Sequence, residues 1–398
     1  MHIQKFLNVV SAKLSNFSAV ELKNLRLLLV SVWALRGRVN FANLARFGCG
    51  SERNLQRIFD GELDWKAVNL ALMGPSPTQD YSVAFIDCTF VKKAGNTTYG
   101  LGYFWSGCDS RTQKGLEVSL LALFNPQTRQ TRALEARQTS PNQNRMQQAI
   151  EQLNESLPQT VDLVVADGWY AAADFFAALE KQGKSAISIL KKNTNMRYLA
   201  TQEDQEAHRA RVPRSRPLKY AGKVDWQNLD LKRFRPVELP KESPYRAYCA
   251  ELNAPNFKRN FQTVVLINKT TNEHIILVCT DLQNPPLPII QRYSDRFQIE
   301  FLFRDAKQHT GLNHAQTRQP KRLHYHFNLS FAAVNLGREL LQDPENPLQS
   351  LNDLKRLAYN ERFLEILKQL TPLDLDSQLS PEQIQQITQW GFIYPETG

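Results

Sequence analysis

Apolar and polar residues follow two different periods along the chain, and the change of period separates a helical region from a strand-forming one. Residues 19–35 and 41–47 carry apolar side chains at helical spacing. From about residue 80 the pattern becomes short apolar runs rich in strand formers, interrupted by helical segments. Strands are expected at 81–91, 98–106, 115–124, 161–166 and 185–190, and helices at 142–157 and 171–182. The pattern predicts an α/β fold with a mixed five-stranded sheet, preceded by a helical domain.

The weaker pattern after residue 190 indicates an insertion into this sheet. Short strands recur at 262–267 and 274–279, and the whole segment is too long for one loop of a compact domain. A mostly β subdomain is therefore expected there, followed by an apolar helix at 327–341. The predicted divisions are a helical domain at 1–75, the first part of the sheet at 76–190, the insertion at 191–288, the second part of the sheet domain at 289–345 and a helical C-terminal region at 346–398.

The helical N-terminal region has the outline of a DNA-reading motif. A glycine-containing turn at 48–50 separates two helical segments, and Ser51 is suited to cap the second one. Arg53, Asn54 and Arg57 lie near the start of that helix, where a helix-turn-helix presents side chains to the major groove. A small α-hairpin that binds no DNA has the same outline. We favour the DNA-binding interpretation.

A further segment carries five polar residues on one side of a predicted helix. At about 100° per residue they fall on one stripe, and the opposite side is apolar, which predicts a single amphipathic helix. Cations on such a stripe can neutralise a nucleic-acid backbone while a carboxylate among them holds a divalent cation. The alternative is a surface helix whose charges pair internally at a spacing of four residues. The five residues are Tyr293, Arg296, Glu300, Arg304 and Lys307.

Two aspartates stand at the ends of buried strands. Asp87 ends the run that begins at Tyr81, and Asp167 ends the run that begins at Val161. Such an aspartate sits at the rim of a sheet, where α/β proteins bind ligands, although a lone one is usually a turn or capping residue. Together with Glu300 the two aspartates supply three carboxylates, the oxygen donors that two Mg²⁺ ions about 3.5–4 Å apart require.

In these residues the chain resembles the DDE transposases of bacterial insertion sequences, in particular the cut-and-paste group with the signature Tyr-x2-Arg-x3-Glu-x6-Lys. Tyr293, Arg296, Glu300 and Lys307 meet every spacing of that signature. The resemblance runs from about Asp87 to the helix near residue 326. It implies an RNase H-like catalytic core that is interrupted by an insertion, acts on double-stranded DNA and works as a homodimer in the DNA complex.

The resemblance also implies roles for single residues. Asp87 would be shared by two Mg²⁺ ions, with Mn²⁺ as a substitute, while Asp167 and Glu300 would each hold one ion. An aromatic residue follows the second aspartate, as in the family, but whether Trp169 or Tyr170 stacks on a flipped base stays open, and with it the use of a DNA hairpin. Contacts to the phosphates of the transposon end are implied for Tyr293, Arg296 and Lys307.

The composition agrees with a polyanionic partner. The formal net charge is +10 and the isoelectric point is near 9.3, which favours nucleic acid but is shared by other classes of protein. Five scattered cysteines without a Cys-x2-Cys pair predict reduced thiols. The sequence contains no apolar run of membrane length, no signal-peptide pattern and no phosphate-binding Gly-x4-Gly-Lys loop. We expect a soluble cytoplasmic protein with no membrane contact and no nucleotide cofactor.

A basic segment at 208–223 interrupts the insertion. It contains six Lys and Arg residues and no acidic residue, so it cannot form a core and is expected to be an exposed loop. It is either a solvated linker or a clamp on the DNA backbone, and we favour the clamp. Four histidines between His309 and His326 do not fit one helix face and have no cysteine near them, so no zinc site is expected. The arginines of the basic segment are Arg209, Arg211, Arg214 and Arg216.

The leading hypothesis is a DNA transposase that cleaves transposon ends and joins them to target DNA with Mg²⁺ held by Asp87, Asp167 and Glu300. Two alternatives stay open. The first is a DNA-binding regulator, or domesticated descendant, without catalytic activity. The second is an RNase H-like structure-specific nuclease without strand transfer.

Overall fold

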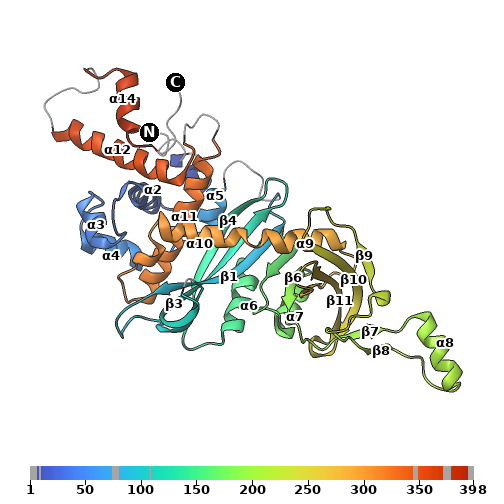
Figure 1. Cartoon of the computed structure of the whole chain (residues 1–398). Helices are drawn as coiled ribbons and strands as arrows, with labels where there is room; N and C mark the ends of the chain where they lie inside the picture. The colour runs from blue at the N-terminus through green and yellow to red at the C-terminus, as the bar shows by residue number, and fades with distance from the viewer. Residues whose placement is uncertain are drawn as a thin grey trace.

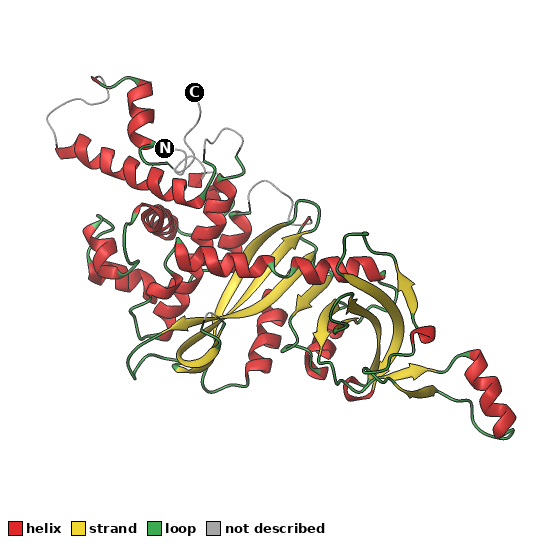
Figure 2. Cartoon of the chain, viewed as in Figure 1, coloured by secondary structure: helices red, strands yellow, loops and turns green. Residues whose placement is uncertain are grey.

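A single large sheet runs through the molecule and carries helices on both of its faces (Figure 1). The computed structural model describes residues 7–8, 10–73, 80–107, 109–343, 348–370 and 378–392. Twelve strands within those ranges pair in the order β2-β3-β1-β5-β6-β12-β11-β10-β7-β8, with β4 beside β3 and β9 beside β10. Figure 2 shows the strands as one continuous layer that ends in a projecting helical arm. The fold is therefore a mixed α/β fold with one large mixed sheet.

The first half of the sheet is formed by strands that meet at β1. β1 pairs antiparallel with β3 and parallel with β5, and β5 pairs parallel with β6. β4 adds to the far side of β3. The bounds are β1 Val83–Lys92, β2 Gly102–Ser106, β3 Arg111–Asn125, β4 Gln130–Gln138, β5 Leu163–Ala166 and β6 Ser185–Leu190. Five of these six strands lie at predicted positions, and β4 was missed.

The inserted segment extends this sheet instead of forming a separate one. β12 pairs antiparallel with β6, so the inserted strands continue the hydrogen-bonded order of the first half. The expectation of a five-stranded sheet was therefore too small, because the insertion uses the open edge of β6. The added strands are β7 Arg197–Leu199, β8 Tyr220–Lys223, β9 Arg235–Val237, β10 Tyr245–Ala254, β11 Arg259–Asn268 and β12 His274–Cys279.

Two layers of helices cover the sheet. α6 Arg145–Ser156 and α7 Ala173–Lys181 lie on one face, and α9 Pro286–Asp295 and α10 Gln298–Gln308 lie end to end across the other (Figure 1). The alternation along β1 divides the core accordingly. Ala84 and Ile86 belong to the cluster with α6 and α7, while Val83 and Phe85 belong to the cluster with α10. Alternate residues of β1 therefore pack into the cores on opposite faces of the sheet.

The N-terminal and C-terminal helices share one core. Buried side chains of α2 Ala19–Ala34, α4 Glu52–Asp60 and α5 Trp65–Ala71 form a single cluster with those of α11 Pro320–Leu340 and α12 Leu351–Leu370. At its centre the fully buried Trp33 donates a hydrogen bond from Nε1 to the Ala333 carbonyl, at 3.0 Å. α3 Phe41–Arg46 and α14 Pro381–Thr388 complete the helical part.

The local signals of the helical region are confirmed at its turn. Gly48 and Gly50 have φ of +85° and +95°, a backbone conformation that glycine adopts without strain. The Ser51 hydroxyl caps α4 by accepting a hydrogen bond from the Asn54 amide, at 3.2 Å. The short α3, the glycine turn and α4 therefore lie where the sequence predicts them. Arg53, Asn54 and Arg57 are exposed on α4.

Candidate active site

The two candidate aspartates are brought together by the register of two parallel strands. Ile86 of β1 is paired with Ala166 of β5. The next residues along the two strands are Asp87 and Asp167, so neighbouring strands about 4.8 Å apart bring the two carboxylates to the same level of the sheet. Their electrostatic coupling agrees with this proximity, because the charge of Asp167 raises the pKa of Asp87. The sequence placed both aspartates near strand ends. Asp167 does follow the end of β5, but Asp87 lies in the middle of β1, and the sequence did not predict that the two are neighbours in register.

Side-chain alternation directs Asp87 and the next residue to opposite faces. Asp87 follows Val83 and Phe85, which pack with α10, whereas Cys88 follows the positions that face α6 and α7. The contacts agree with this division. Asp87 accepts a hydrogen bond from Arg296 at the α10 face, and the Cys88 thiol lies 3.3 Å from the Tyr170 hydroxyl on the other face. Tyr170 is therefore buried in the core behind the carboxylates.

Arg296 lies at a short interruption between α9 and α10. The sequence predicted one unbroken helix from Tyr293 to Lys307, and this is corrected here. The Phe297 and Glu300 amides bond to carbonyls three residues back, at 3.3 and 3.1 Å, in place of the four-residue spacing of an α-helix. α9 and α10 continue in nearly the same direction across this tightened turn (Figure 1). Arg296, before the second helix, therefore still lies next to Glu300 within it.

The Arg296 guanidinium is the cation of the candidate site. Its Nη1 donates to the Asp87 carboxylate at 2.8 Å, and its Nη2 lies 3.6 Å from the Glu300 carboxylate. Although burial opposes the charge, the carboxylates of Asp87, Asp167 and Glu300, together with Tyr293, raise the pKa of Arg296. The Arg296 to Glu300 ion pair of the alternative interpretation is present. It is accompanied by a contact to the sheet that the helix pattern did not predict.

Asp87 is held in a poorly hydrated position. Burial raises its pKa to about 6, while Arg296 lowers it and Asp167 and Glu300 raise it. One carboxylate oxygen accepts a hydrogen bond from its neighbouring backbone amide, at 2.8 Å. Arg296 therefore favours the ionised form of Asp87, whereas burial, Asp167 and Glu300 favour the protonated form.

The remaining stripe residues line a groove beside these carboxylates. The groove encloses about 760 Å³ between β1, the hairpin of β2 and β3, and α10. Glu300, Arg304 and Lys307 line it, as does Asp87. Tyr293 is half-buried and is not among the residues that line this groove. The guanidinium carbon of Arg296 lies 5.8 Å from the centre of its ring. The structure thus places Glu300, Arg304 and Lys307 of α10 in the same groove as Asp87 of β1.

The groove also contains residues to which the sequence assigned no function. Lys92 ends β1 five residues after Asp87, and Trp105 is exposed on β2, with 64% of its surface accessible. The signal for Lys92 was present, because two lysines follow the Asp87 strand directly. Trp105 carried no local signal, since an aromatic residue in a strand is most often part of the core.

Three carboxylates suit a divalent cation by their chemistry, because Mg²⁺ prefers hard oxygen ligands. Asp87, Asp167 and Glu300 supply that donor set. Their present spacing is wider, since no group of three His, Cys, Asp or Glu side chains in the described ranges is close enough to hold a metal ion. Arg296 instead supplies the positive charge between Asp87 and Glu300. Carboxylate oxygens are the donors that the expected metal prefers, and Arg296 forms ion pairs with two of the three residues, Asp87 and Glu300.

The arginines of the basic segment lie on an arm away from the carboxylates. Arg209 and Arg211 are in α8 Gln202–Arg211, which buries no residue and projects from β7 and β8 (Figure 1). Arg214 and Arg216 follow in an exposed loop. The prediction of a loop at 208–223 is therefore corrected at both ends. Its first residues belong to α8, which Thr201 caps through a reciprocal bond with Asp204, and its last four form β8.

The histidines and tryptophans left open by the sequence have structural partners. The Nδ1 of His314 accepts a hydrogen bond from the Val39 amide at 3.1 Å, and His326 bonds to the Gly311 carbonyl at 2.8 Å. Trp226 donates to the Thr194 carbonyl at 2.7 Å and is buried. Trp169 is partly exposed, with the guanidinium of Arg145 4.7 Å from its ring centre.

The four cysteines in the described part of the chain, at positions 49, 88, 249 and 279, are free thiols, and Cys108 lies outside it. Within the same ranges no helix has the length and apolar character needed to cross a membrane.

Comparison with known proteins adds two findings. Residues 78–336 match the model of a family described as "Transposase DDE domain". Among solved structures, the chain is similar to one titled "Cryo-EM structure of piggyBac transposase synaptic complex with hairpin DNA". That likeness has 10% sequence identity and a TM-score of 0.45, and it covers 97% of this chain and 82% of the other. No curated protein matches the sequence.

Proposed function

Because the chain belongs to the transposase DDE domain family, we propose that it is a DNA transposase that cuts transposon ends and joins them to target DNA with Mg²⁺. The single observation that best supports this chemistry is the parallel register of β1 and β5, which makes Asp87 and Asp167 neighbours on the sheet face beneath α10. Glu300 faces the same groove as Asp87. We assign the catalytic roles to these three residues.

The order of the central strands supports an RNase H-like core as part of the same proposal. β4, β3 and β1 form an antiparallel set, and β5 and β6 run parallel to β1 on its other side. The Glu300 helix packs on the face of β1 that carries Asp87. The three carboxylates come from three separate elements. Asp87 and Glu300 line one groove, and Asp167 is the neighbour of Asp87 through the pairing of β1 with β5.

The residues around the carboxylates would position the DNA. Lys92 and Lys307 line the groove and suit phosphate oxygens, while Arg296 is charged throughout the physiological pH range. Mg²⁺ bound by Asp87, Asp167 and Glu300 would supply activation of the attacking oxygen and stabilisation of the leaving one. Arg296 contacts both Asp87 and Glu300 and so holds the two side chains near each other before the metal binds, and it would turn to a phosphate when DNA enters.

A DNA-binding regulator without cleavage is the second candidate. It is favoured by the ion pairs of Arg296, which hold two of the three carboxylates. In such a protein the arginine would be a permanent replacement for the metal. Homodimer formation on DNA and nucleoid localisation belong to the proposal for either candidate.

The test is a cleavage assay on DNA that carries the terminal sequences of the element, taken from the DNA flanking the gene. The Asp167→Asn and Glu300→Gln variants should lose Mg²⁺-dependent cleavage and retain DNA binding, because they remove a metal ligand but no cation. Asp174→Asn on the exposed start of α7 is a matched control and should cleave normally. Wild-type cleavage by Glu300→Gln would refute the metal role of Glu300, and binding without cleavage by the wild-type protein would favour the regulator.

A further inference from the structure

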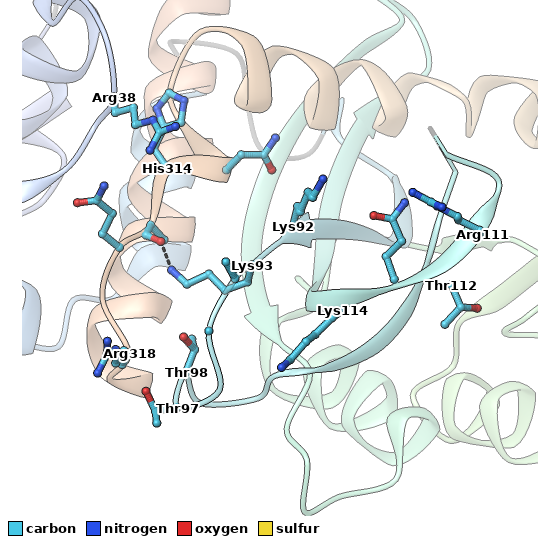
Figure 3. Close-up of a pocket in the computed structure, with 16 residues that line it drawn as sticks. Arg38, Lys92, Lys93, Thr97, Thr98, Arg111, Thr112, Lys114, His314 and Arg318 are labelled. Carbon is cyan, nitrogen blue, oxygen red and sulfur yellow. Dashed lines mark hydrogen bonds between the residues drawn. The ribbon is translucent and has the colours of Figure 1, made fainter.

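A second groove adjoins the one that contains Asp87 and Glu300, and of the residues assigned above it includes Lys92. It encloses about 1040 Å³, is lined by cationic side chains from four segments of the chain, and has no aspartate or glutamate among its lining residues (Figure 3). Three threonine side chains add hydroxyl groups to it. Its lysines and arginines are Arg38, Lys92, Lys93, Arg111, Lys114 and Arg318.

Contacts between segments far apart in sequence hold this groove in shape. Lys93 donates a hydrogen bond to the Ala315 carbonyl, which ties the loop after β1 to the segment before α11. The Tyr99 amide bonds to the Arg318 carbonyl at 3.1 Å across the same boundary. Lys114 bonds to the Asn96 side chain within the β1 to β2 connection. The groove is therefore built into the fold and does not depend on a single loop.

The protein balances the positive charge of the groove only in part. Hydrogen bonds from Ser106 and Gln113, and after them the charges of Arg111 and Lys92, lower the pKa of Asp109, which lines the first groove. Within the described residues none of its six lysines and arginines forms an ion pair with a carboxylate, whereas Lys321 and Arg322 at the start of α11 pair with Glu62 and Asp60. Burial, and after it the like charge of Arg318, lowers the pKa of Lys93, so both the position of this lysine and its neighbour oppose its charge. Such crowding is stabilised by an anionic ligand.

The two grooves adjoin each other, so a ligand that is long enough can lie in both. Lys92 and Asn313 line both of them. The path from Asp87 to Lys92 covers five residues of β1, or about 17 Å at about 3.3 Å per residue. A duplex advances about 3.4 Å per nucleotide of one strand, so a strand whose phosphate lies at Asp87 reaches the second groove about five nucleotides further on.

We propose that this cationic groove holds the phosphodiester backbone of DNA about five nucleotides from the bond at Asp87. The inference rests on the proposed function, since it places the same DNA in both grooves. Arginine and lysine heads would contact phosphate oxygens, and the hydroxyls of Thr97, Thr98 and Thr112 would donate further hydrogen bonds. The contacts are to the backbone, so they hold DNA of any sequence in place without reading it.

The first experiment measures the salt dependence of binding to a labelled duplex of about 30 base pairs, using the Arg111→Ala/Arg318→Ala double variant. Both side chains are exposed and form no ion pair in the described residues, so the fold should persist. Removing two cations that bind phosphates should reduce the slope of log K against log salt by about 1.8. Lys181→Ala/Arg246→Ala, which removes two exposed cations outside both grooves, is the matched control and should keep the wild-type slope.

The second experiment locates the contact along the DNA. End duplexes are shortened in steps on either side of the cleavage position, and the affinities of wild type and double variant are compared. The difference between the two proteins should disappear once one side is shorter than about five base pairs. A difference that persists on the shortest duplexes, or an unchanged salt slope in the first experiment, would overturn the inference.

Failure of the proposed function gives a different result. If wild type neither binds duplex DNA nor cleaves it, the proposed function falls and the groove inference falls with it. If wild type cleaves normally and the double variant matches it in slope and length dependence, only the groove inference is wrong. Weaker heparin binding by the double variant, with DNA binding unchanged, would show a site for another polyanion and would also overturn it.

Discussion

At the scale of single residues, the guanidinium of Arg296 occupies the place where the proposed chemistry needs positive charge. It contacts Asp87 and Glu300, and neither it nor Asp87 is freely exposed. Removal of this side chain would therefore leave a poorly hydrated carboxylate without its partner. That cost exceeds the value of an exposed helical ion pair, which is about 0.3–0.5 kcal/mol.

Arg296→Ala is expected to lower the free energy of unfolding by about 1–3 kcal/mol, because the Asp87 carboxylate loses its charged hydrogen-bond donor and keeps only the Cys88 amide. Cleavage should fall as well, because alanine cannot bind the phosphate. Urea unfolding and the cleavage assay on the same variant measure both effects. The Arg296→Ala/Asp87→Asn double variant should regain most of the stability but no activity, and a double variant as unstable as the single one would contradict this account.

His326 gives a prediction on pH. Burial lowers its pKa to about 4 from 6.5, so between these values the unfolded chain binds a proton that the folded chain excludes. The contribution to stability is complete above pH 6.5 and is lost as the pH falls toward 4. At about pH 5 the decrease in stability is about 2 kcal/mol.

The His326→Asn variant tests this effect, because its side chain can still donate to the Gly311 carbonyl but does not titrate. Unfolding free energies are measured for both proteins at about pH 7.5 and pH 5. Wild type should lose about 2 kcal/mol more than the variant over this interval. Equal losses would show that His326 is protonated in the folded protein.

At the scale of elements, some strands follow from the local sequence pattern, whereas β4 depends on contacts with other elements. β12 and β6 were predicted to the residue, since apolar runs of strand formers also fill the core. β4 was missed because its sequence, rich in Gln, Arg, Ala and Glu, favours a helix. It is a strand because it pairs along its length with β3, and on its other edge Asn328 and Asn335 of α11 accept hydrogen bonds from the Ala136 and Ala133 amides, at 2.9 Å each.

The candidate site follows the same division. Asp167 could be recognised from the sequence as the end of a strand, and the stripe on α10 from its period, whereas Asp87, also expected near a strand end, lies in the middle of β1. The contact between Arg296 and Asp87 could not be predicted, because it depends on how α10 crosses the sheet. Nor could the cationic groove, whose lining residues come from positions 38, 92–98, 111–114 and 313–318.

The arm that carries α8 allows a prediction without risk to the fold, since α8 buries no residue. Replacement of Arg209, Arg211, Arg214 and Arg216 with alanine should leave the melting temperature unchanged. If the arm clamps DNA, the salt slope of binding should fall by about 0.9 for each phosphate that the variant no longer neutralises. Glu203→Ala/Glu206→Ala, on the same helix, is the control for general damage. An unchanged slope in the quadruple variant would make the arm a solvated linker.

At the scale of the whole molecule, the helical ends and the sheet domain are joined by a common core. Gly337 of α11 is packed against Trp33 of α2, and a β-carbon at Gly337 would lie 2.4 Å from the tryptophan ring. The N-terminal helices, expected to form a domain of their own, therefore depend on α11 for part of their packing.

Gly337→Ala is expected to destabilise the protein by about 1–3 kcal/mol through this overlap. Trp33→Phe removes part of the indole and should relieve the clash, so the double variant should be more stable than the sum of the two single effects predicts. Thermal or urea unfolding of the four proteins measures the coupling. Strict additivity would contradict the contact.

The pairing of β6 with β12 has a consequence for how DNA could be gripped. An inserted segment joined through a loop could swing on a hinge and close over its substrate. Here it pairs with β6, which pairs in turn with β5 and, through it, with β1, so it cannot rotate without breaking the sheet. A duplex that touches both the α8 arm and the carboxylates must then adapt itself to a fixed frame. The DNA must then bend, and the bending costs free energy. A duplex with flexible pyrimidine–purine steps between the two contacts should therefore bind more tightly than a stiffer duplex.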